Sequence, residues 1–402
     1  MSEDATNPLR DSPAFRSLWI ARTISHVGDG IALLALVLLV QRTRGTGVAV
    51  GTLLLASSLP RFLGPLAGVL VDRVEQRGLM IACDLGQVVV FSAIAWFSPS
   101  FPILLGLVSV SAVLDTVFAP AGRSAVPALV RPEQLLRANA WIGTSLNLQV
   151  ALGPVLGGLL VDLFHERGAL AVNAGTFLVS ALVLLRLPRL RVPSEGEPGG
   201  FLAVGADGLR FAWRTPAIRA LVIALFLGVA FAAVDNVALV FLVKESLHGS
   251  PVAFGVVGGA YGVGMLAGSL GLSWKGTAMS VSLLLILGWV ASGVGTLVTG
   301  VAPLLAIAIL GQAVAGLGNG VENIAADTLI QQAVPREMLG RVFGLVATAP
   351  FAGSTIAFAA GGFLMDATSP RAVFAIAGVG VLAVLVPLML VLRRHAPGDG
   401  TP

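Results

Sequence analysis

Long apolar stretches separated by short polar segments run through the whole chain. A helix that crosses a bilayer needs about 20 mostly apolar residues, and six such stretches lie before residue 188 and six after residue 216. Pro, Gly or charged residues stand at almost every junction, as they do where helices end. The pattern therefore predicts twelve membrane-spanning helices. Their expected ranges are 17–41, 48–71, 79–97, 102–122, 138–161, 168–187, 217–243, 252–273, 278–300, 303–327, 341–365 and 371–392.

The composition supports a membrane protein. The 402 residues are 56% hydrophobic and only 11% charged, and the mean hydropathy is +0.91, whereas soluble domains carry roughly 25% charged residues. Helices that face lipid need apolar side chains on their outer surface as well. The composition therefore excludes a soluble enzyme and predicts an all-α protein of the cell (inner or plasma) membrane.

Charge, cysteine usage and missing motifs exclude several other classes. The net charge of +4 comes mainly from arginines spread singly between apolar runs, so we expect no nucleic-acid partner. The single Cys83 cannot form an intrachain disulfide, and the first sixteen residues lack the apolar core of a cleaved signal peptide. The sequence contains no P-loop, nucleophile elbow or metal-ligand spacing of histidines. We therefore expect no enzymatic activity, no metal and no cofactor.

The basic residues are distributed unevenly among the predicted loops. With the N-terminus placed inside, 18 of the 25 Lys and Arg residues fall in cytoplasmic segments and 5 in outside segments, while Arg22 and Arg61 lie within spans. Cytoplasmic loops of membrane proteins are enriched in Lys and Arg. The distribution therefore predicts that both termini lie in the cytoplasm.

The second half of the chain repeats the first at a fixed offset of 204 residues. This offset places Glu133 over Glu337, and the run 157–162 over 361–366, without a gap. An even number of spans separates the copies, so both halves have the same orientation, as in transporters built from parallel repeats. We therefore expect two six-helix halves joined by a cytoplasmic linker, with boundaries at 1–188, 189–215 and 216–402.

The loop after the second predicted span carries a recognisable motif. Residues 68–77 read Gly-Val-Leu-Val-Asp-Arg-Val-Glu-Gln-Arg. This run resembles the loop signature of the major facilitator superfamily, in which Gly, three apolar or small residues, Asp-Arg and further basic residues follow one another. The resemblance implies the twelve-helix fold of that superfamily and assigns Gly68, Asp72, Arg73 and Arg77 to a cytoplasmic gate.

Asp72 suits such a gate on physical grounds. A carboxylate at the cytoplasmic end of one half can accept hydrogen bonds from the free N–H groups that begin the eleventh span near Gly340, where the helix dipole is positive. That contact would latch the halves together on the inside. Arg73 and Arg77 either bind carboxylates such as Asp84 or only set the topology.

Two further patterns narrow the resemblance. The fifth predicted span has a Gly-Pro and Gly-Gly pattern similar to that of antiporters in the superfamily, at Gly153, Pro154, Gly157 and Gly158. The runs 15–19, 63–68 and 133–140 resemble the drug-exporter branch that includes macrolide efflux proteins and the enterobactin exporter. The resemblance implies that the chain exports small molecules.

Ionisable residues at membrane depth cost several kcal/mol unless they are paired or hydrated, so they are candidates for function. On the first span Arg22, Ser25, His26 and Asp29 form one polar stripe at helical spacing. Asp29 lies about twelve residues, or roughly 18 Å, from the cytoplasmic end, and Arg61 reaches a similar depth on the second span. These two residues form either a structural ion pair or part of a functional site.

Asp115 on the fourth span is the first candidate for proton coupling, and Asp29 is the second. The sequence offers no basic partner at the depth of Asp115, and an unpaired carboxyl in low-dielectric surroundings favours its neutral form, as a proton carrier requires. His26 is either a further titrating group or a packing histidine. The remaining polar residues that we expect to line a cavity are Arg61, Asp235, Asn319 and Glu322.

These patterns predict a secondary active exporter of small amphipathic or lipophilic molecules, such as drugs, antibiotics or secondary metabolites. We expect proton antiport and alternating access between the two halves. The alternatives are a dedicated siderophore or metabolite exporter, a lipid flippase, and a transport-inactive receptor or scaffold. The expected partners are a small-molecule substrate, protons and the lipid bilayer, and we expect the protein to act as a monomer.

Overall fold

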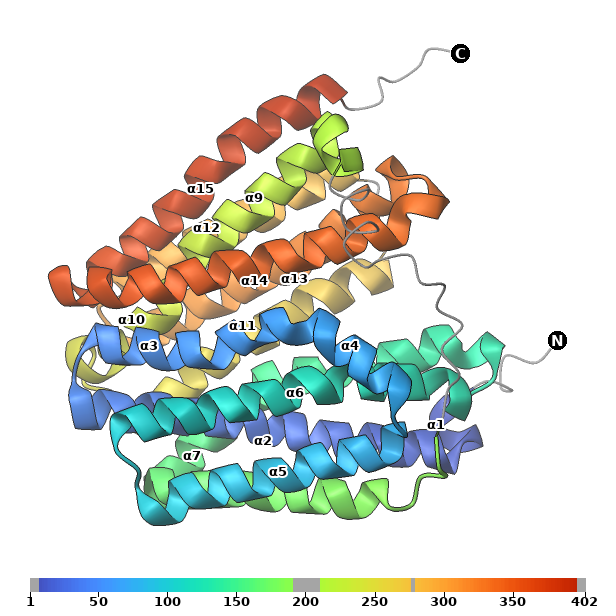
Figure 1. Cartoon of the computed structure of the whole chain (residues 1–402). Helices are drawn as coiled ribbons and strands as arrows, with labels where there is room; N and C mark the ends of the chain where they lie inside the picture. The colour runs from blue at the N-terminus through green and yellow to red at the C-terminus, as the bar shows by residue number, and fades with distance from the viewer. Residues whose placement is uncertain (1–6, 191–209, 276–278, 396–402) are drawn as a thin grey trace. The chain divides into compact units, whose positions relative to one another are not determined.

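The computed structural model of the chain is built from helices (Figure 1). It describes residues 7–190, 210–275 and 279–395, and no strand occurs among them. The helices form two compact units: unit 1 comprises Met1–Thr43 and Leu53–Gly196, and unit 2 comprises Arg44–Thr52 and Glu197–Pro402. Most of the predicted linker at 189–215 lies outside the described residues.

The helices confirm the expected class of an all-α membrane protein. Ten helices in the described part of the chain are long and apolar enough to cross a bilayer. The two spans expected at 138–161 and 168–187 are continuous as α7 (Leu135–Leu184), which is interrupted only by the non-helical His165 (φ 58°). The span expected at 48–71 is divided among α3 (Gly47–Ser58), the 3₁₀ helix η1 (Leu59–Leu63) and α4 (Gly64–Arg73). The full count of twelve crossings stays a prediction.

One apolar cluster of unit 1 takes side chains from α2, α5, α6 and α7. The cluster includes Phe15, Met80, Cys83, Phe118 and Ile142, each with at most 9% of its surface exposed. Its helices thus bury apolar faces against one another even though their outer faces are apolar too. Besides α7, η1, α4 and the later part of α3, the unit contains α1 (Pro8–Asp11), α2 (Pro13–Arg44, as far as Thr43), α5 (Gln76–Phe97), α6 (Phe101–Leu129) and the short η2 (Pro132–Gln134).

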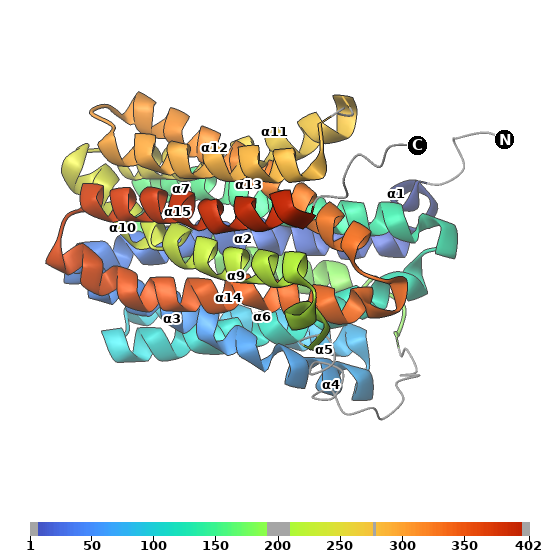
Figure 2. The ribbon, with the colours of Figure 1, turned by 90° about the horizontal axis from the view of Figure 1, so that it is seen from above.

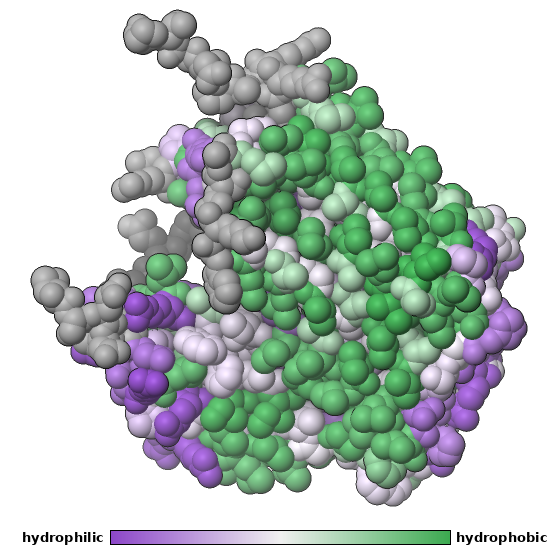
Figure 3. Space-filling model, turned by 180° about the vertical axis from the view of Figure 1, so that it is seen from behind, coloured by the Kyte–Doolittle hydropathy of each residue, from purple (hydrophilic) through white to green (hydrophobic). Residues whose placement is uncertain are grey.

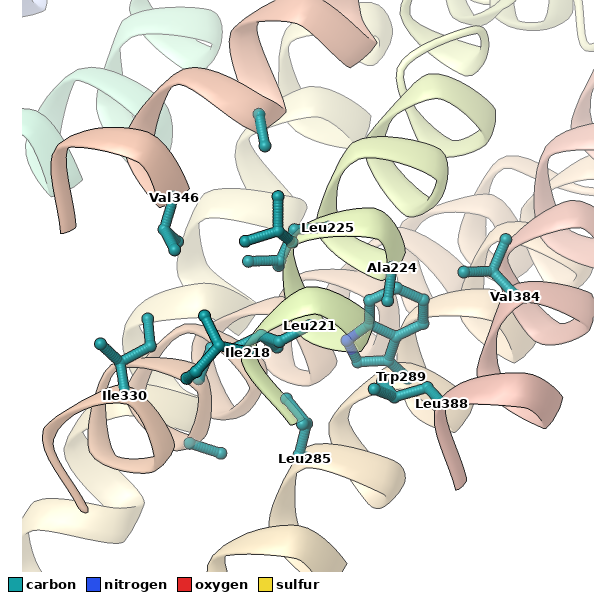
Figure 4. Packing of buried hydrophobic residues seen from close by; sticks show 14 of the residues in the cluster. Ile218, Leu221, Ala224, Leu225, Leu285, Trp289, Ile330, Val346, Val384 and Leu388 are labelled. Carbon is teal, nitrogen blue, oxygen red and sulfur yellow. The ribbon is translucent and has the colours of Figure 1, made fainter. Parts of the chain in front are cut away.

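Unit 2 has its own core around Trp289, which is 1% exposed (Figure 4). Ile218 and Leu221 on one helix, and Leu285 and Leu388 on two others, belong to the same buried cluster. A single large indole therefore fills the space between several helices. The helices of unit 2 are α9 (Pro216–Ala232), α10 (Asp235–Phe241), the π-helix η3 (Leu242–Ser246), α11 (Pro251–Lys275), α12 (Val281–Val301), α13 (Leu305–Ala333), α14 (Arg336–Ala367) and α15 (Pro370–His395).

Glycines bring α13 into backbone contact with α11 and with α12, which lie near it in Figure 2. A Cβ at Gly316 of α13 would collide with the carbonyl oxygen of Tyr261 on α11. A Cβ at Gly288 of α12 would lie 2.8 Å from the carbonyl oxygen of Gly318 on α13. Association of helices in lipid depends on such close packing of small residues, because lipid is as apolar as the helices themselves. These glycines therefore hold the three helices together.

Large apolar side chains cover the outer surface of the described helices. Phe97 and Leu136 are 83% exposed, and Trp96 is 71% exposed. On the face shown in Figure 3, hydrophobic side chains predominate and hydrophilic ones gather at the left and right margins. The hydrocarbon core of a bilayer can cover such a surface, whereas water cannot solvate it. The protein is therefore a multi-pass membrane protein.

We expect Gly316→Ala to destabilise unit 2, because the new methyl group must push α13 away from α11. Overpacking of this kind costs about 1–3 kcal/mol of unfolding free energy. The control is Gly271→Ala on α11, where an added Cβ meets no atom within 4 Å and better helix propensity adds up to about 1 kcal/mol. The measurement is the loss of helical circular dichroism on heating in detergent. Equal stability of the two variants would contradict the close-packing argument.

Candidate functional site

A polar stripe on α2 carries three charged or titratable side chains in unit 1. Arg22 Nη2 lies 3.4 Å from His26 Nε2, and His26 Nδ1 lies 4.0 Å from Asp29 Oδ2. A guanidinium can only donate hydrogen bonds, so His26 Nε2 accepts and the ring proton of neutral His26 is on Nδ1. The ring hydrogen therefore faces Asp29. The stripe predicted from helical spacing thus forms a connected row.

Arg22 is buried without a carboxylate partner. The residue is 3% exposed, and none of the ion pairs among the described residues includes it. Its Cζ atom lies 5.9 Å from the centre of the Phe118 ring on α6. Gly122, also on α6, leaves the space that Nη1 occupies, since a Cβ there would lie 2.6 Å from this atom. The helix surface of α6 therefore accommodates the guanidinium and supplies a cation–π contact.

Arg61 interacts electrostatically with both Asp29 and Asp115. It is positioned by η1, where Pro60 lacks the N–H that an α-helix would need and the chain continues as a 3₁₀ turn that packs against α6. The prediction that Asp115 lacks a basic partner at its depth is wrong. Arg61 is also exposed, so its electrostatic interaction with Asp29 is not that of the buried ion pair considered from the sequence.

Two residues on α5 complete this group, and sequence reasoning missed their role. Gln87 is 1% exposed and donates from Nε2 to the Ser111 carbonyl oxygen at 3.1 Å and to Asp115 Oδ1 at 2.7 Å. Asp84, one turn earlier, is also 1% exposed and interacts electrostatically with Asp115 and Asp29. The same rule that selected Asp115, a carboxyl inside an apolar span, could have found Asp84. We call Asp29, Asp84, Asp115, Arg61 and Gln87 the unit 1 polar group.

Unit 2 contains a separate set of polar residues. Tyr261 on α11 interacts electrostatically with Asp235 at the start of α10 and with Glu322 on α13. Glu322 is 8% exposed and lies beside Trp289. On the same helix, Asn323 Nδ2 donates to Asn319 Oδ1 at 3.1 Å. The structure therefore brings Asp235 and Glu322 together through Tyr261, which the sequence did not single out. Among the described residues, no cluster of His, Cys, Asp and Glu could hold a metal ion.

The predicted gate loop is anchored within unit 1. Glu75 accepts hydrogen bonds from the backbone N–H groups of Arg77, Gly78 and Leu190 at 2.7–3.0 Å, and Arg77 donates to the Leu185 carbonyl oxygen at 2.8 Å. Burial raises the pKa of Glu75, but these amide hydrogen bonds and nearby Arg77 outweigh it, so its pKa lies below the usual value. Arg77 therefore binds a backbone carbonyl instead of Asp84.

Gly68 and Arg73 of the predicted gate lie in α4, whereas the Asp72 side chain cannot be described. Gly68 lies in α4, where an added Cβ would meet no atom within 4 Å, and Arg73 is exposed at the end of the same helix. The Asp72 side chain lies outside what the structure describes. The Asp72 latch thus stays a prediction.

The predicted antiporter pattern packs α7 against α2. A Cβ at Gly153 would lie 2.6 Å from the Cα atom of Gly30, and a Cβ at Gly157 would lie 3.1 Å from the Cα atom of Ile31. Pro154 lies between these contacts, inside α7, and Gly158 is buried. The pattern therefore allows close approach beside Asp29, one residue before Gly30.

Within unit 2, a carboxylate binds the start of α3. Asp366 accepts hydrogen bonds from the backbone N–H groups of Gly47, through Oδ1, and Val48, through Oδ2 at 3.0 Å. A Cβ at Gly362 would lie 2.8 Å from the Cα atom of Val48, so the backbones also touch. This is the kind of interaction expected of Asp72, a carboxylate at a positive helix N-terminus. The expected contact joins the end of the second predicted span to the start of the eleventh, whereas Asp366 joins the end of the eleventh to the start of the second. In the second repeat, Pro251 occupies the position of Gly47 and has no N–H to donate.

We expect Arg61 to be coupled energetically to Asp29 and to Asp115. Arg61→Gln removes the positive charge that both carboxyls share, so a second change, Asp29→Asn or Asp115→Asn, should cost less in that background. The coupling energy should be about 0.5–3 kcal/mol, below the roughly 3–5 kcal/mol lost when a buried pair is broken, because Arg61 is exposed. Double-mutant cycles of unfolding free energy in detergent measure it, with exposed Arg16→Gln as the control. Additive losses in both Arg61 cycles would show that these side chains do not interact.

Comparisons with known proteins agree with this architecture. Residues 4–399 match the family model described as transmembrane secretion effector, of the major facilitator superfamily. The chain is 28% identical to the enterobactin exporter EntS of Salmonella typhi, covering 98% of this chain and 96% of the relative. It is 27% identical to the multidrug efflux pump Tap of Mycolicibacterium fortuitum, covering 95% and 97%. The crystal structure of the nucleoside transporter NupG has the same fold, with a TM-score of 0.72 at 13% identity over 95% of this chain and 99% of that one. The chain therefore belongs to the transmembrane secretion effector family of the major facilitator superfamily.

Proposed function

We propose that the protein is a secondary active exporter of small amphipathic or lipophilic molecules, driven by proton antiport. The observation that carries this proposal is the unit 1 polar group, in which Asp29, Asp84 and Asp115 interact with one another on membrane-spanning helices. Carboxyls at membrane depth are costly and commonly belong to proton or ion pathways. Similarity to an enterobactin exporter and a multidrug efflux pump over nearly the whole chain supports export.

The predicted orientation gives the transport cycle its direction. The arginine distribution predicts that both termini lie in the cytoplasm, which would make the Arg22 end of α2 face the cytoplasm and the loop after α2 face outward. An antiporter in this orientation takes up a proton from outside and a substrate from inside, in alternation. The carboxyls of the unit 1 polar group bind the proton, and Arg61 offers a positive charge to whichever carboxyl is ionised.

We propose that the hydrogen bonds of Asp366 to the start of α3, both within unit 2, change during the transport cycle. Helix α3 belongs to both units, since its first residues, 47–52, pack in unit 2 and its later residues, 53–58, pack in unit 1. A movement of the start of α3 relative to the rest of unit 2 must break the hydrogen bonds of Asp366 to Gly47 and Val48. We call these bonds the outer latch, because the predicted orientation places this end of α3 outside.

Asp115→Asn tests proton coupling. The amide resembles the protonated carboxyl in size, so we expect exchange of ethidium down its own gradient to continue, whereas uphill efflux driven by an imposed pH gradient is lost. Purified protein in liposomes allows both assays on the same sample. The matched control is Asp162→Asn, an exposed carboxyl of α7, which should leave both activities unchanged.

Two outcomes would contradict the coupling scheme. Uphill efflux that survives in Asp115→Asn removes Asp115 as the coupling residue. Uphill efflux that survives in both Asp115→Asn and Asp29→Asn removes the model in which these two carboxyls couple proton and substrate.

The outer latch is tested by cysteine labelling. Ala49 on α3 is 6% exposed, so Ala49→Cys in a Cys83→Ser background reports when the start of α3 leaves unit 2. We expect Asp366→Ala to raise the labelling rate by an impermeant maleimide roughly tenfold or more, because hydrogen bonds to a charged group are worth about 1.5–3 kcal/mol. The control is Asp162→Ala, the equivalent carboxylate of the first repeat. A labelling rate that does not respond to Asp366→Ala would rule out the latch.

A dedicated siderophore exporter is the second candidate function. The similarity to enterobactin exporters of several bacteria favours it, at 28–29% identity over at least 96% of this chain. The same liposomes distinguish the two candidates. Uphill efflux of a catecholate siderophore without uphill efflux of ethidium would select the dedicated exporter.

A further inference from the structure

Three buried polar side chains lie on α5 and α7 of unit 1. Asp84 and Gln87 are each 1% exposed and sit one turn apart on α5, and Ser180 on α7 is 0% exposed and lies beside Asp84. The Ser180 hydroxyl is placed to donate to Asp84, but Asp84 Oδ2 and Gln87 Oε1 have no hydrogen-bond partner in good geometry among the described residues. Buried polar atoms almost always have a partner, so an unsatisfied group of this kind requires an explanation.

The orientation of the Gln87 amide is fixed by its other contacts. Nε2 donates to the Ser111 carbonyl oxygen and to Asp115 Oδ1, so both of its hydrogens are used. Exchanging Nε2 and Oε1 would place an oxygen against two other oxygens, which is unfavourable. Oε1 is therefore an acceptor without a donor, on the same face of α5 as Asp84.

The acceptor atoms in this place outnumber the donor hydrogens. The Ser180 hydroxyl supplies one hydrogen, while an ionised Asp84 and the Gln87 oxygen can only accept. No Lys, Arg or His among the described residues forms an ion pair with Asp84. An ionised carboxylate in this place would be a buried charge without compensation, at a cost of several kcal/mol. One proton on Asp84 removes the charge and provides the missing donor.

We infer that Asp84 carries a proton in this conformation and that Gln87 joins Asp84 and Asp115 into one proton-binding site. This inference rests on the proposed proton antiport and adds a carboxyl to it. Asp84 and Asp115 repel each other when both are ionised, so they share a proton more readily than either holds one alone. The charged groups around them are Asp29 on α2, which interacts with both, and Arg61 on η1, which interacts with Asp115.

Infrared spectroscopy tests this assignment without relying on transport. A protonated carboxyl has a C=O stretching band that an ionised one lacks. We expect wild-type protein in lipid nanodiscs at neutral pH to show such a band, and Asp84→Asn to lose part of its intensity. Asp162→Asn, which changes an exposed carboxyl, should leave the band unchanged. An unchanged band in Asp84→Asn would overturn the inference.

Two conservative variants keep the test decisive if Asp84→Asn does not fold. Asp84→Glu keeps a carboxyl but moves it by one methylene, so the frequency of the band should shift. Gln87→Leu removes the amide at similar size, so the same band should shift because Asp84 loses its neighbouring acceptor. A band that keeps its frequency in both variants would assign the proton to another carboxyl.

Transport assays then separate this inference from the proposed function. We expect Asp84→Asn to lose uphill, pH-driven efflux of ethidium in liposomes while exchange down the ethidium gradient continues. Loss of the infrared band together with normal uphill efflux would show that Asp84 is protonated but not in the coupling site, which overturns the joint site. If Asp115→Asn alone retains uphill efflux, the proposed coupling through Asp115 fails, whatever the infrared result for Asp84.

Discussion

The interior of a bilayer offers no water to pair with polar groups, and this constraint organises the whole protein. Every charged side chain inside unit 1 lies near another polar group: Arg22 beside His26, His26 beside Asp29, and Asp115 between Gln87 and Arg61. Each of these polar groups lowers the cost of burying its neighbour, so the free energy of burial depends on the group as a whole. A replacement at one position therefore changes the charge balance of the others.

Much of the architecture follows from the sequence, because the length of each apolar stretch matches the thickness of the bilayer and the motifs identify the superfamily. The all-α membrane class and the superfamily were predictable, and an interaction of Asp29 with Arg61 was among the alternatives that the sequence offered. Depth does not specify the direction of a side chain, so Gln87 could not be placed against Asp115. From the sequence, Asp84 was interpreted as a partner for loop arginines. Arg77 instead binds the Leu185 carbonyl oxygen, and the sequence pattern does not reveal a contact between segments more than 100 residues apart. The break in the second span was also missed, although Pro60 marks it.

The two repeats have kept their helix order but differ in their interior chemistry. At the fixed offset of 204 residues, Gly288 of α12 stands where unit 1 has Asp84. A side chain at Gly288 would meet the backbone of α13, so this position has no room for a carboxyl. Unit 2 thus combines glycine-mediated helix contacts with few charges, whereas unit 1 contains more polar groups.

The buried Cys83 lies next to Asp84 on α5. Its thiol is 4% exposed within the apolar cluster of unit 1, and the next residue along α5 is Asp84. A thiol packed among apolar side chains reacts slowly, because the reactive thiolate is disfavoured there. Mercurial or maleimide reagents should therefore spare the resting protein and modify it only when α5 loosens from its neighbours. The native chain thus contains its own chemical reporter, one residue away from a carboxyl inside the membrane.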